Sequence, residues 1–589
     1  MNNPSQFYTS QIEEHQIKLD SFKLKLTLYS LSRVLVYLAG VMGVYKYFLE
    51  WQIVIAITVV CVTLFLILVS KHSNLKAKRD LFKNLLEINK EEIQIASGNF
   101  HKRYKGVQFQ DPKHYYSLDI DLFGRGSLFQ YMNRTVIDEG TFALVDALTA
   151  NDIGNINLRQ EAIKELAIKP EWRQLYTAKA SLVETEIPTN IIIDWLKTYK
   201  KFLPNIMKWL PMVFGSISVL IIVLGTTKVI PVDYIGYWLL LGLAITGVYL
   251  KKTNNLSMHT TKVKDTFRQY AQLLDQIENE EFSSELLIAK QLQIQSNDIK
   301  ASKIFKTLSK SLDALDNRNN MFSIFLGNGF LLWDIIQSYK IERWIETYDN
   351  KVEDWFEVVS FFDSYNSLGN FDFNHPLYVF PEITNNKTTL KAECLGHPLL
   401  DVAKRIDSDV TIKNEQFFIV TGANMAGKST FLRTISLHIV MANAGLPVCA
   451  KSSQYSPVKL ITSMRTTDSL TDDSSYFFSE LTRLKFIVDA IQTEPYFIVL
   501  DEILKGTNST DKAIGSRKFV EKLVSGNATG IIATHDLSLC EIEAELEDVV
   551  NHYFDAEIIN DELFFDYKFK QGICQNMNAS FLLKKMEIV

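Results

Sequence analysis

A glycine-rich octapeptide has the clearest chemical signature in this 589-residue sequence. Residues 422–429 read Gly-Ala-Asn-Met-Ala-Gly-Lys-Ser and fit the pattern G-x-x-x-x-G-K-[ST], whose backbone N–H groups wrap around phosphate oxygens. In this pattern the lysine reaches the β- and γ-phosphates and the serine holds Mg²⁺. The residues predicted to contact ATP here are Gly422, Ala423, Asn424, Met425, Ala426, Gly427, Lys428, Ser429 and Thr430.

Two more polar groups follow apolar runs. Residues 497–500 are wholly apolar and end in Asp501 and Glu502, and the run "GIIAT" ends in His535. Asp501 is expected to bind Mg²⁺ together with Ser429, and Glu502 to orient or deprotonate the attacking water. A lone histidine is more often structural, but its place after a third strand favours contact with the γ-phosphate or its water. The sequence therefore predicts an Mg²⁺-dependent ATP hydrolase with Glu502 and His535 as catalytic residues.

The elements that must position these residues are short β-rich runs alternating with helices. The runs "QFFIV", "YFIVL" and "GIIAT" are predicted strands, and their alternation with helices predicts an α/β domain over residues 386–589. Upstream, residues 116–200 and 258–368 carry apolar residues at three- and four-residue spacing. These two regions are expected to be mostly helical.

Four apolar segments, in two pairs, predict two transmembrane hairpins: residues 29–49 with 51–70, and residues 209–227 with 234–250. The twenty uncharged residues 51–70 are long enough to cover a hydrocarbon core of about 30 Å. Basic residues on the outer flanks predict that both hairpins enter from the cytoplasm and that both termini stay there, which makes the chain a multi-pass protein of the cytoplasmic (inner) membrane in contact with lipids. The alternative is a set of buried core helices. The flanking residues are Lys23, Lys25, Arg33, Lys71, Lys76, Lys78, Arg79, Lys197, Lys200, Lys201, Lys208, Lys251 and Lys252.

Composition narrows the classes of protein further. A formal net charge of −6 gives no overall attraction to nucleic acid, so any such contact must come from a local patch. Five cysteines without CxxC spacing favour reduced thiols over a disulfide framework.

Four segments in a fixed order carry a family resemblance: "TGANMAGKSTFLRT", "SSYFFSELTRL", "VLDEILKGTNSTD" and "IIATHD". Together they resemble the ATPase domain of the MutS family, a branch of the ABC-type ATPases. Residues 126–166 are similar to the start of the family's core, or lever, domain. The resemblance covers residues 119–200 and 356–589, with a looser helical match between them.

The resemblance implies a homodimer with composite ATP sites. Ser475 and Phe477, together with Glu480, correspond to the segment that the family places across a dimer interface against the partner's γ-phosphate. Asp511 lies in a stretch that packs at the same interface in the family.

The resemblance leaves the partner of this ATPase open. Family members that detect mismatches carry two N-terminal domains, whereas here little more than a hairpin precedes Asp119, and the second hairpin lies where the family inserts its DNA clamp. The first hypothesis is a membrane-anchored ATPase acting on DNA, in mismatch repair or related DNA processing. The second is a mechanical membrane ATPase. The third, an ABC transporter subunit, is disfavoured because "SSYFFSEL" replaces an LSGGQ-type signature and the hairpins offer no polar path.

The predicted organisation is multidomain: a C-terminal α/β ABC-type P-loop ATPase, an all-α lever and two transmembrane hairpins. Its parts are residues 1–28 (cytoplasmic segment), 29–70 (hairpin), 71–117 (helical linker), 118–208 (first part of the lever), 209–250 (hairpin), 251–385 (second part of the lever) and 386–589 (ATPase).

Overall fold

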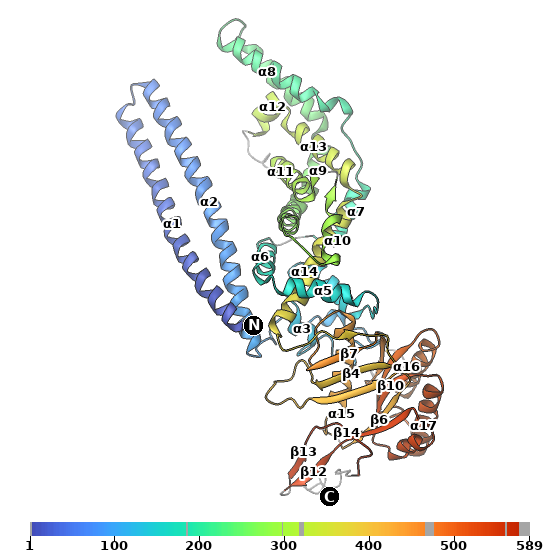
Figure 1. The fold of residues 1–589 in the computed structure, drawn as a ribbon. Coiled ribbons are helices and arrows are strands. Elements are labelled where there is room, and N and C mark those ends of the chain that lie inside the picture. The colour runs from blue at the N-terminus through green and yellow to red at the C-terminus, as the bar shows by residue number, and fades with distance from the viewer. Residues whose placement is uncertain are drawn as a thin grey trace.

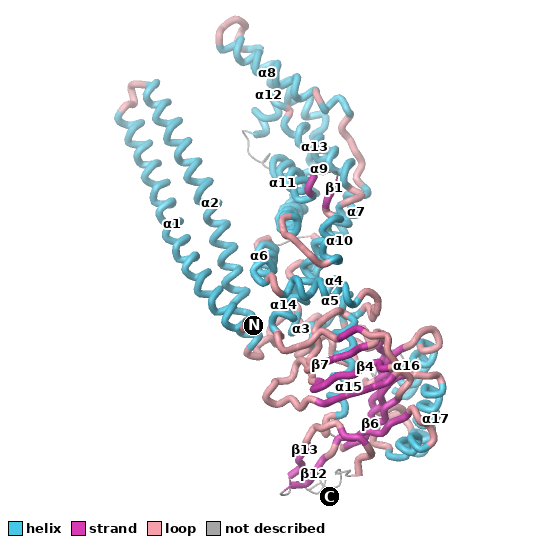
Figure 2. The backbone as a smooth tube through the Cα atoms, viewed as in Figure 1, coloured by secondary structure: helices cyan, strands magenta, loops and turns pink. Residues whose placement is uncertain are grey.

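The computed structural model of the chain describes residues 3–183, 187–296, 299–316, 323–423, 425–465, 476–559 and 562–575. It has three parts: a long N-terminal helical hairpin, a helical body, and a C-terminal part built of sheets and flanking helices (Figure 1). Helix dominates the first two parts, whereas the long strands lie in the third (Figure 2). The chain is therefore multidomain, as predicted.

The N-terminal hairpin consists of α1 (Pro4–Lys46) and α2 (Trp51–Ala96), which run side by side (Figure 1). Both helices are long and apolar enough to cross a membrane, and their most apolar windows have no buried residue. The predicted segments 29–49 and 51–70 form the distal half of this hairpin. The predicted helical linker, residues 71–117, is helical only as far as Ala96. After it the chain adopts positive φ at Gly98 and Gly106 and forms a single short turn, η1 (Val107–Phe109).

A buried polar cluster joins the base of this hairpin to the helical body. The Glu92 carboxylate accepts from the Arg134 guanidinium (Nη2 to Oε2, 3.1 Å) and from the side-chain amides of Asn370 and Asn374 (3.0 Å each). The Tyr8 hydroxyl donates to Asn374 Oδ1 at 2.7 Å, which ties α1 into the same cluster. Burial alone would raise the pKa of Glu92, but Arg134, together with Arg103 and the Asn374 side chain, outweighs it and holds that pKa below its ordinary value. The cluster therefore contains a charged pair that is satisfied only when the hairpin is docked.

The helical body packs around α14, whose core is rich in aromatic side chains such as Trp355 and Phe362. Residues 116–200 and 258–368 are mostly helical, as predicted. The elements are α3 (Leu128–Met132), α4 (Asp138–Thr149), α5 (Ile156–Ala167), α6 (Pro170–Ala180), α7 (Thr189–Thr198), α10 (Glu285–Gln293), β1 (Gln295–Ser296), β2 (Ile299–Lys300), α11 (Ala301–Asp316), α13 (Trp333–Tyr348) and α14 (Val352–Asn374).

A second apolar hairpin projects from the far end of the body (Figure 1). After η2 (Asn205–Lys208), α8 (Leu210–Thr226) leads to α9 (Asp233–Glu278), a continuous helix whose second half packs in the body. By length and composition α9 could cross a membrane, whereas α8 is a shorter apolar helix of 17 residues. A short segment, η4 (Ser323–Gly327) and α12 (Asn328–Leu331), lies against this hairpin.

The C-terminal part contains a six-stranded sheet in the order β14-β11-β6-β10-β9-β8, in which the five strands from β11 to β8 are parallel. The predicted strands are β6, β9 and β10, and they pair in parallel. The strands of this sheet are β6 (Phe417–Gly422), β8 (Lys459–Ser463), β9 (Tyr496–Asp501), β10 (Thr529–Ala533), β11 (Val549–Phe554) and β14 (Lys570–Gln571). The helices are α15 (Lys428–Asn443), α16 (Tyr476–Ala490), α17 (Ser509–Ser525) and η5 (Leu537–Ala544).

Two smaller sheets complete the domain. One has the order β3-β7-β4-β5 and the other is a hairpin of β12 and β13. Their strands are β3 (Glu382–Ile383), β4 (Thr388–Leu395), β5 (Ser408–Lys413), β7 (Ser452–Tyr455), β12 (Ala556–Ile559) and β13 (Glu562–Phe565).

A buried carboxyl group on α14 makes the stability of the body depend on pH. Asp363 is fully buried, accepts from the N–H groups of Val136 and Ile137 (2.9 and 3.1 Å), and burial raises its pKa to about 7. The folded chain keeps this proton up to about pH 7, whereas the unfolded chain releases it near its ordinary pKa, so stability falls as pH rises between these values. Between pH 5 and pH 8 this group should lower stability by roughly 2 kcal/mol.

We therefore expect the thermal unfolding midpoint to fall less between pH 5 and pH 8 in Asp363→Asn than in the parent protein, because the amide cannot ionise. Asp354→Asn, which changes an exposed aspartate of the same helix, is the matched control and should behave like the parent. An equal fall in all three proteins would contradict the prediction.

Candidate nucleotide site

The register of three parallel strands brings the predicted polar residues to one edge of the sheet. Ala533 at the end of β10 pairs with Val420 of β6 on one side and with Asp501 of β9 on the other. The segments that follow these strands carry the glycine loop, Glu502 and His535. Because all three strands end at the same level, these residues face a common space.

The glycine loop owes its path to two left-handed glycines. Gly422 has a φ of 149°, and a Cβ there would lie 2.6 Å from the carbonyl oxygen of Phe554 on the neighbouring strand. Gly427 has a φ of 105° and is the N-cap of α15. Larger residues are strained in this region of φ. The loop therefore directs the N-terminus of α15, with its unpaired N–H groups, at the space beside the sheet.

Lys428 lies folded over its own loop. Its side chain is only 6% exposed, and Nζ donates to the carbonyl oxygens of Gly422 (2.7 Å) and Ala423 (3.1 Å). Nζ also lies 3.2 Å from His535 Nε2. Burial lowers the pKa of Lys428, while the nearby carboxylates Asp501 and Glu502 act in the opposite direction. The positive charge of Lys428 is thus held by carbonyl oxygens of the loop. An incoming anion can take the place of these oxygens as the partner of Nζ.

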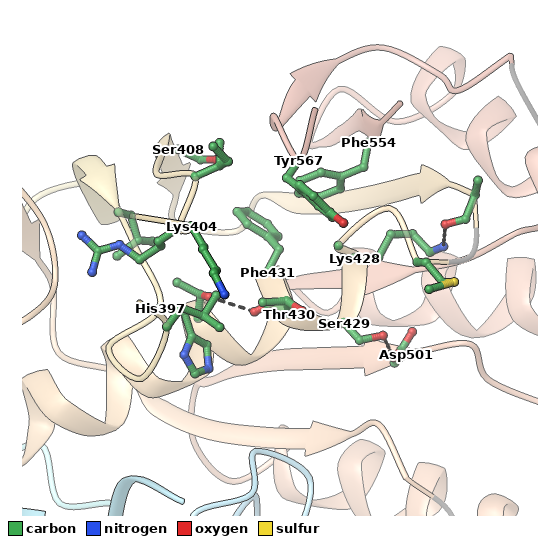
Figure 3. Close-up of a pocket in the computed structure, with 18 of the residues that line it drawn as sticks. His397, Lys404, Ser408, Lys428, Ser429, Thr430, Phe431, Asp501, Phe554 and Tyr567 are labelled. Atoms are coloured by element: carbon green, nitrogen blue, oxygen red, sulfur yellow. Dashed lines mark hydrogen bonds between the residues drawn. The ribbon is translucent and has the colours of Figure 1, made fainter. Parts of the chain in front are cut away.

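The two predicted metal ligands, Ser429 in the first turn of α15 and Asp501 at the end of β9, are in direct contact. Ser429 Oγ donates to Asp501 Oδ2 at 2.7 Å (Figure 3). In the described part of the chain no group of three His, Cys, Asp or Glu side chains could hold a metal ion. A hydroxyl and a carboxylate, completed by water and phosphate oxygens, nevertheless form the kind of all-oxygen set that Mg²⁺ prefers. The donor chemistry of this pair therefore fits Mg²⁺.

Glu502 and His535 are in hydrogen-bond contact across the strand ends, with 2.9 Å between Oε1 and Nε2. Glu502 has a φ of 49°, and its N–H donates to the Ala533 carbonyl, which fixes the turn that presents its side chain. The hydrogen bond from His535 lowers the pKa of Glu502 to about 2. Since the same ring nitrogen also lies near Lys428, His535 can accept from Lys428 in one tautomer and donate to Glu502 in the other.

A cavity of about 530 Å³ surrounds these groups and includes residues that the sequence did not single out as site residues. They come from strands and loops far apart in the sequence and lie on the open side of the glycine loop (Figure 3). Tyr567 packs over the loop, 3.2 Å from where a Cβ of Gly427 would be, and Phe431 contacts Phe554 edge to face. Burial lowers the pKa of His397 to about 4, so this ring is neutral at physiological pH. These apolar and neutral groups border the cavity beyond the phosphate loop.

The structure brings most predicted site residues together, but not all. Met425, Gly427, Lys428, Ser429, Thr430, Asp501, Glu502 and His535 line one cavity with Ala423, and Gly422 and Ala426 belong to the same loop. Phe477 does not line this cavity. It is half-buried in the first turn of α16 and packs against the apolar core beneath that helix. Asn424 and Ser475 lie outside the described residues.

Glu480 has a different setting from the interface position that the family resemblance implies. It is buried within its own domain, and its Oε2 accepts from the backbone N–H of Lys505 at 3.0 Å. Burial raises its pKa, while N–H groups of Leu504, Lys505 and Gly506 lower it. Asp511, expected at the same interface, is exposed in the first turn of α17 and donates its N–H to Asn508 Oδ1. Glu480 therefore anchors the loop that follows the Asp501-Glu502 pair.

A parallel sheet with a glycine loop before a helix and carboxylates at the same edge is typical of α/β domains that bind phosphate-bearing ligands. Residues 418–585 match the family model described as MutS domain V. The chain is 33% identical over 226 residues to MutS protein homolog 4 of Homo sapiens, a match that covers 36% of this chain and 23% of the human protein. It is 27% identical over 240 residues to DNA mismatch repair protein MutS of Staphylococcus haemolyticus, covering 40% and 27%.

The C-terminal domain of this chain therefore belongs to the MutS family. A further match, 34% identity over 194 residues, is to DNA mismatch repair protein MutS of Fusobacterium nucleatum and covers 31% of this chain and 21% of that protein. The chain thus spans about a quarter of the length of these curated relatives.

The anchoring of the loop after β9 by Glu480 can be tested by substitution. Glu480→Ala removes the acceptor of a loop N–H group and should lower the stability of the folded protein by about 1–3 kcal/mol. Because Lys505 in this loop lines the cavity, we expect weaker binding of a fluorescent ATP analogue. Glu480→Gln keeps an oxygen acceptor and should bind nearly as well as the parent. Equal affinity in all three proteins would show that the loop does not depend on this side chain.

Proposed function

We propose that this chain is a membrane-anchored ATPase of the MutS type, which binds and hydrolyses ATP with Mg²⁺ at the edge of its parallel sheet and works as a homodimer. The observation that carries the proposal is the convergence of Lys428, the Ser429–Asp501 pair and the Glu502–His535 pair on one cavity.

Binding begins at the loop and the start of α15. Lys428 already points its ammonium group at the loop carbonyls, and the triphosphate offers it stronger, charged acceptors. The N–H groups at the N-terminus of α15 add their partial positive charge. Ser429 and Asp501 hold Mg²⁺, which when bound neutralises charge on the phosphate oxygens.

Glu502 and His535 act on the attacking water. A carboxylate with a pKa of about 2 stays ionised at neutral pH and is a weak base, so Glu502 orients the water more effectively than it removes its proton. When Lys428 turns to the phosphates, Nε2 of His535 is left to donate to Glu502. This fixes the carboxylate in the position that the water requires.

In the proposed dimer, each protomer supplies Phe477 to the ATP site of the other. Phe477 lies away from the cavity of its own chain, so a role at a γ-phosphate requires another copy. The family resemblance supports the same arrangement, with Ser475 and Phe477 of each protomer acting on the ATP of the other.

Two partners are proposed besides ATP. The exposed apolar surfaces of α1, α2, α8 and α9 support contact with membrane lipids and a location in the cytoplasmic membrane, with the ATPase on the cytoplasmic side. The names of the bacterial relatives, DNA mismatch repair protein MutS, support DNA as the molecule on which ATP-driven closure acts.

A second candidate function, movement of the membrane hairpin itself, is favoured by one observation. The Glu92 cluster ties both helices of the N-terminal hairpin to α14, and the chain passes from α14 directly into the C-terminal domain. A change in the position of α14 would therefore move the hairpin.

Substitution of Glu502 by Gln should separate ATP binding from hydrolysis. The amide keeps the size of the side chain but cannot orient water as a carboxylate does, so we expect ATP to bind with near-parental affinity, turnover to fall at least tenfold, and an ATP-bound dimer to accumulate. Lys428→Ala is the matched comparison and should abolish binding, because it removes the charge that faces the phosphates. Binding is followed by a fluorescent ATP analogue, turnover by phosphate release, and the dimer by light scattering. Parental turnover in Glu502→Gln would contradict the assigned role.

The choice between DNA and the membrane as the output is testable with the full chain in lipid nanodiscs. We expect matched, mismatched and branched duplexes to bind with an affinity that falls with salt and responds to ATP in the parent, but not in Lys428→Ala. Binding no stronger than the non-specific level at physiological salt, alongside active hydrolysis, would refute the DNA role and leave the mechanical one.

A further inference from the structure

The short segment of η4 and α12, residues 323–332, lies beside the second apolar hairpin and leads directly into α13. In the sequence α11 precedes the segment and α13 follows it, and both helices lie on the same side of it (Figure 1). We propose that residues 323–332 form a re-entrant membrane element, embedded between α8 and α9 and facing the acyl chains of the lipids. This rests on the proposed membrane anchoring and adds an element that the sequence assigned to the helical lever.

Two glycines bring the segment into backbone contact with α9. A Cβ on Gly242 would lie 2.1 Å from the carbonyl oxygen of Gly329, and a Cβ on Gly329 would lie 2.8 Å from Leu239 Cγ. Close packing of small residues is how helices associate within lipid, where apolar side chains gain little by leaving the solvent. Gly236 and Gly247 of the same helix have no atom within 4 Å of such a Cβ. The close approach is therefore specific to Gly242.

The polar groups of this short helical segment and of the residues that follow it find partners inside the unit. Ser218 of α8 donates to the carbonyl oxygen of Phe330 at 2.7 Å, and Trp238 of α9 donates its indole N–H to Ser218 Oγ at 2.7 Å. Asn328 is buried, and its Oδ1 accepts from the N–H of Asp334 at 2.9 Å. The last carbonyl groups of so short a helix have no partner within the helix, and at membrane depth they must be satisfied by other protein groups in this way.

The depth of the segment matches the middle of a bilayer. Gly242 precedes Lys252 by ten residues, about 15 Å at helical rise, and half of a hydrocarbon core is about 15 Å. Lys252 lines a cavity of about 460 Å³ with Lys200, Lys201, the aromatic side chains of Trp195 and Tyr199, and others. Basic and aromatic residues together are typical of the headgroup level on the cytoplasmic side. The segment therefore lies half a bilayer above the lysines.

The outward face of the segment is apolar and exposed. Phe325, Leu326 and Leu331 are 52%, 49% and 43% exposed, which is close to the 55% and 50% of Leu220 and Val223 on α8. These side chains therefore add exposed apolar surface to that of the hairpin. A surface of this kind requires an apolar environment.

Depth-dependent quenching of a fluorophore tests the proposal in the full chain. The exposed Cys394 and the half-buried Cys61 are changed to Ser, single cysteines are placed at Leu331, at Leu220 and at Glu346 of α13, and each is labelled with an environment-sensitive maleimide. The proteins are reconstituted in liposomes whose phospholipids carry a quencher at mid-chain. We expect strong lipid quenching at positions 331 and 220, and quenching by aqueous iodide alone at 346.

Each other outcome has a defined meaning. Lipid quenching at 220 with iodide quenching at 331 would overturn the re-entrant element while the anchoring stands. Iodide quenching at both positions would overturn the anchoring and, with it, this inference. Protection of position 331 from both quenchers would show that protein covers this face, such as a second copy of the chain, and would also overturn the proposal.

A matched pair of glycine substitutions links the depth to the backbone contact. Gly242→Ala places a methyl group where the Gly329 carbonyl lies, so we expect at least a twofold loss of lipid quenching at position 331 with no change at 220. Gly247→Ala adds the same methyl group to the same helix in open space and should leave both positions unchanged. Equal quenching at 331 in the two variants would show that the glycine contact does not hold the segment.

Discussion

The register of β6, β10 and β9 is the constraint on which the candidate site depends. These strands are buried on both faces, and a Cβ on Gly530 of β10 would lie 2.5 Å from the carbonyl oxygen of Ile498 of β9, so the strands have no room to slide. A shift of one residue would turn every side chain to the opposite face. Asp501 would then lose Ser429, and Glu502 would lose His535. The chemistry of the site is therefore set by the packing of apolar residues that take no part in it.

The same sheet is fixed to the helical body along its outer edge. β8 is the last strand, and an uncovered edge leaves backbone groups without partners. The Asn151 side chain completes that edge by exchanging two hydrogen bonds of 2.9 Å with the backbone of Leu460, and Asp119 accepts from the N–H of Arg465 at 2.9 Å. Both residues come from the helical body. Asn151 and Asp119 therefore couple the position of β8 and of Arg465 to that of the helical body.

What the sequence could predict is whatever depends on local pattern. The glycine loop, the Asp501-Glu502 pair and His535 each follow an apolar strand, and parallel pairing alone brings them together. Tyr567 could not be predicted, because its place over Gly427 depends on a hairpin 140 residues away in the chain. The burial of Glu480 could not be predicted for a similar reason. Its partner is a backbone N–H group, which every residue except proline has and which therefore leaves no pattern in the sequence. Residues 323–332 are too short for a spanning helix, so the sequence alone assigns them to the helical lever.

The buried pair of Glu92 and Arg134 shows how the two ends of the molecule are coupled. A buried ion pair adds little net stability, but removing either partner leaves a charge without compensation and costs about 3–5 kcal/mol. Such a pair therefore contributes little net stability, but it makes docking of the hairpin all-or-none, because the hairpin docks only when every partner is in place. Asn370 and Asn374, which also donate to Glu92, include the last turns of α14, next to the C-terminal domain, in this requirement. Any displacement of α14 must therefore carry the hairpin with it or break the whole cluster, so the positions of the hairpin and of α14 are coupled.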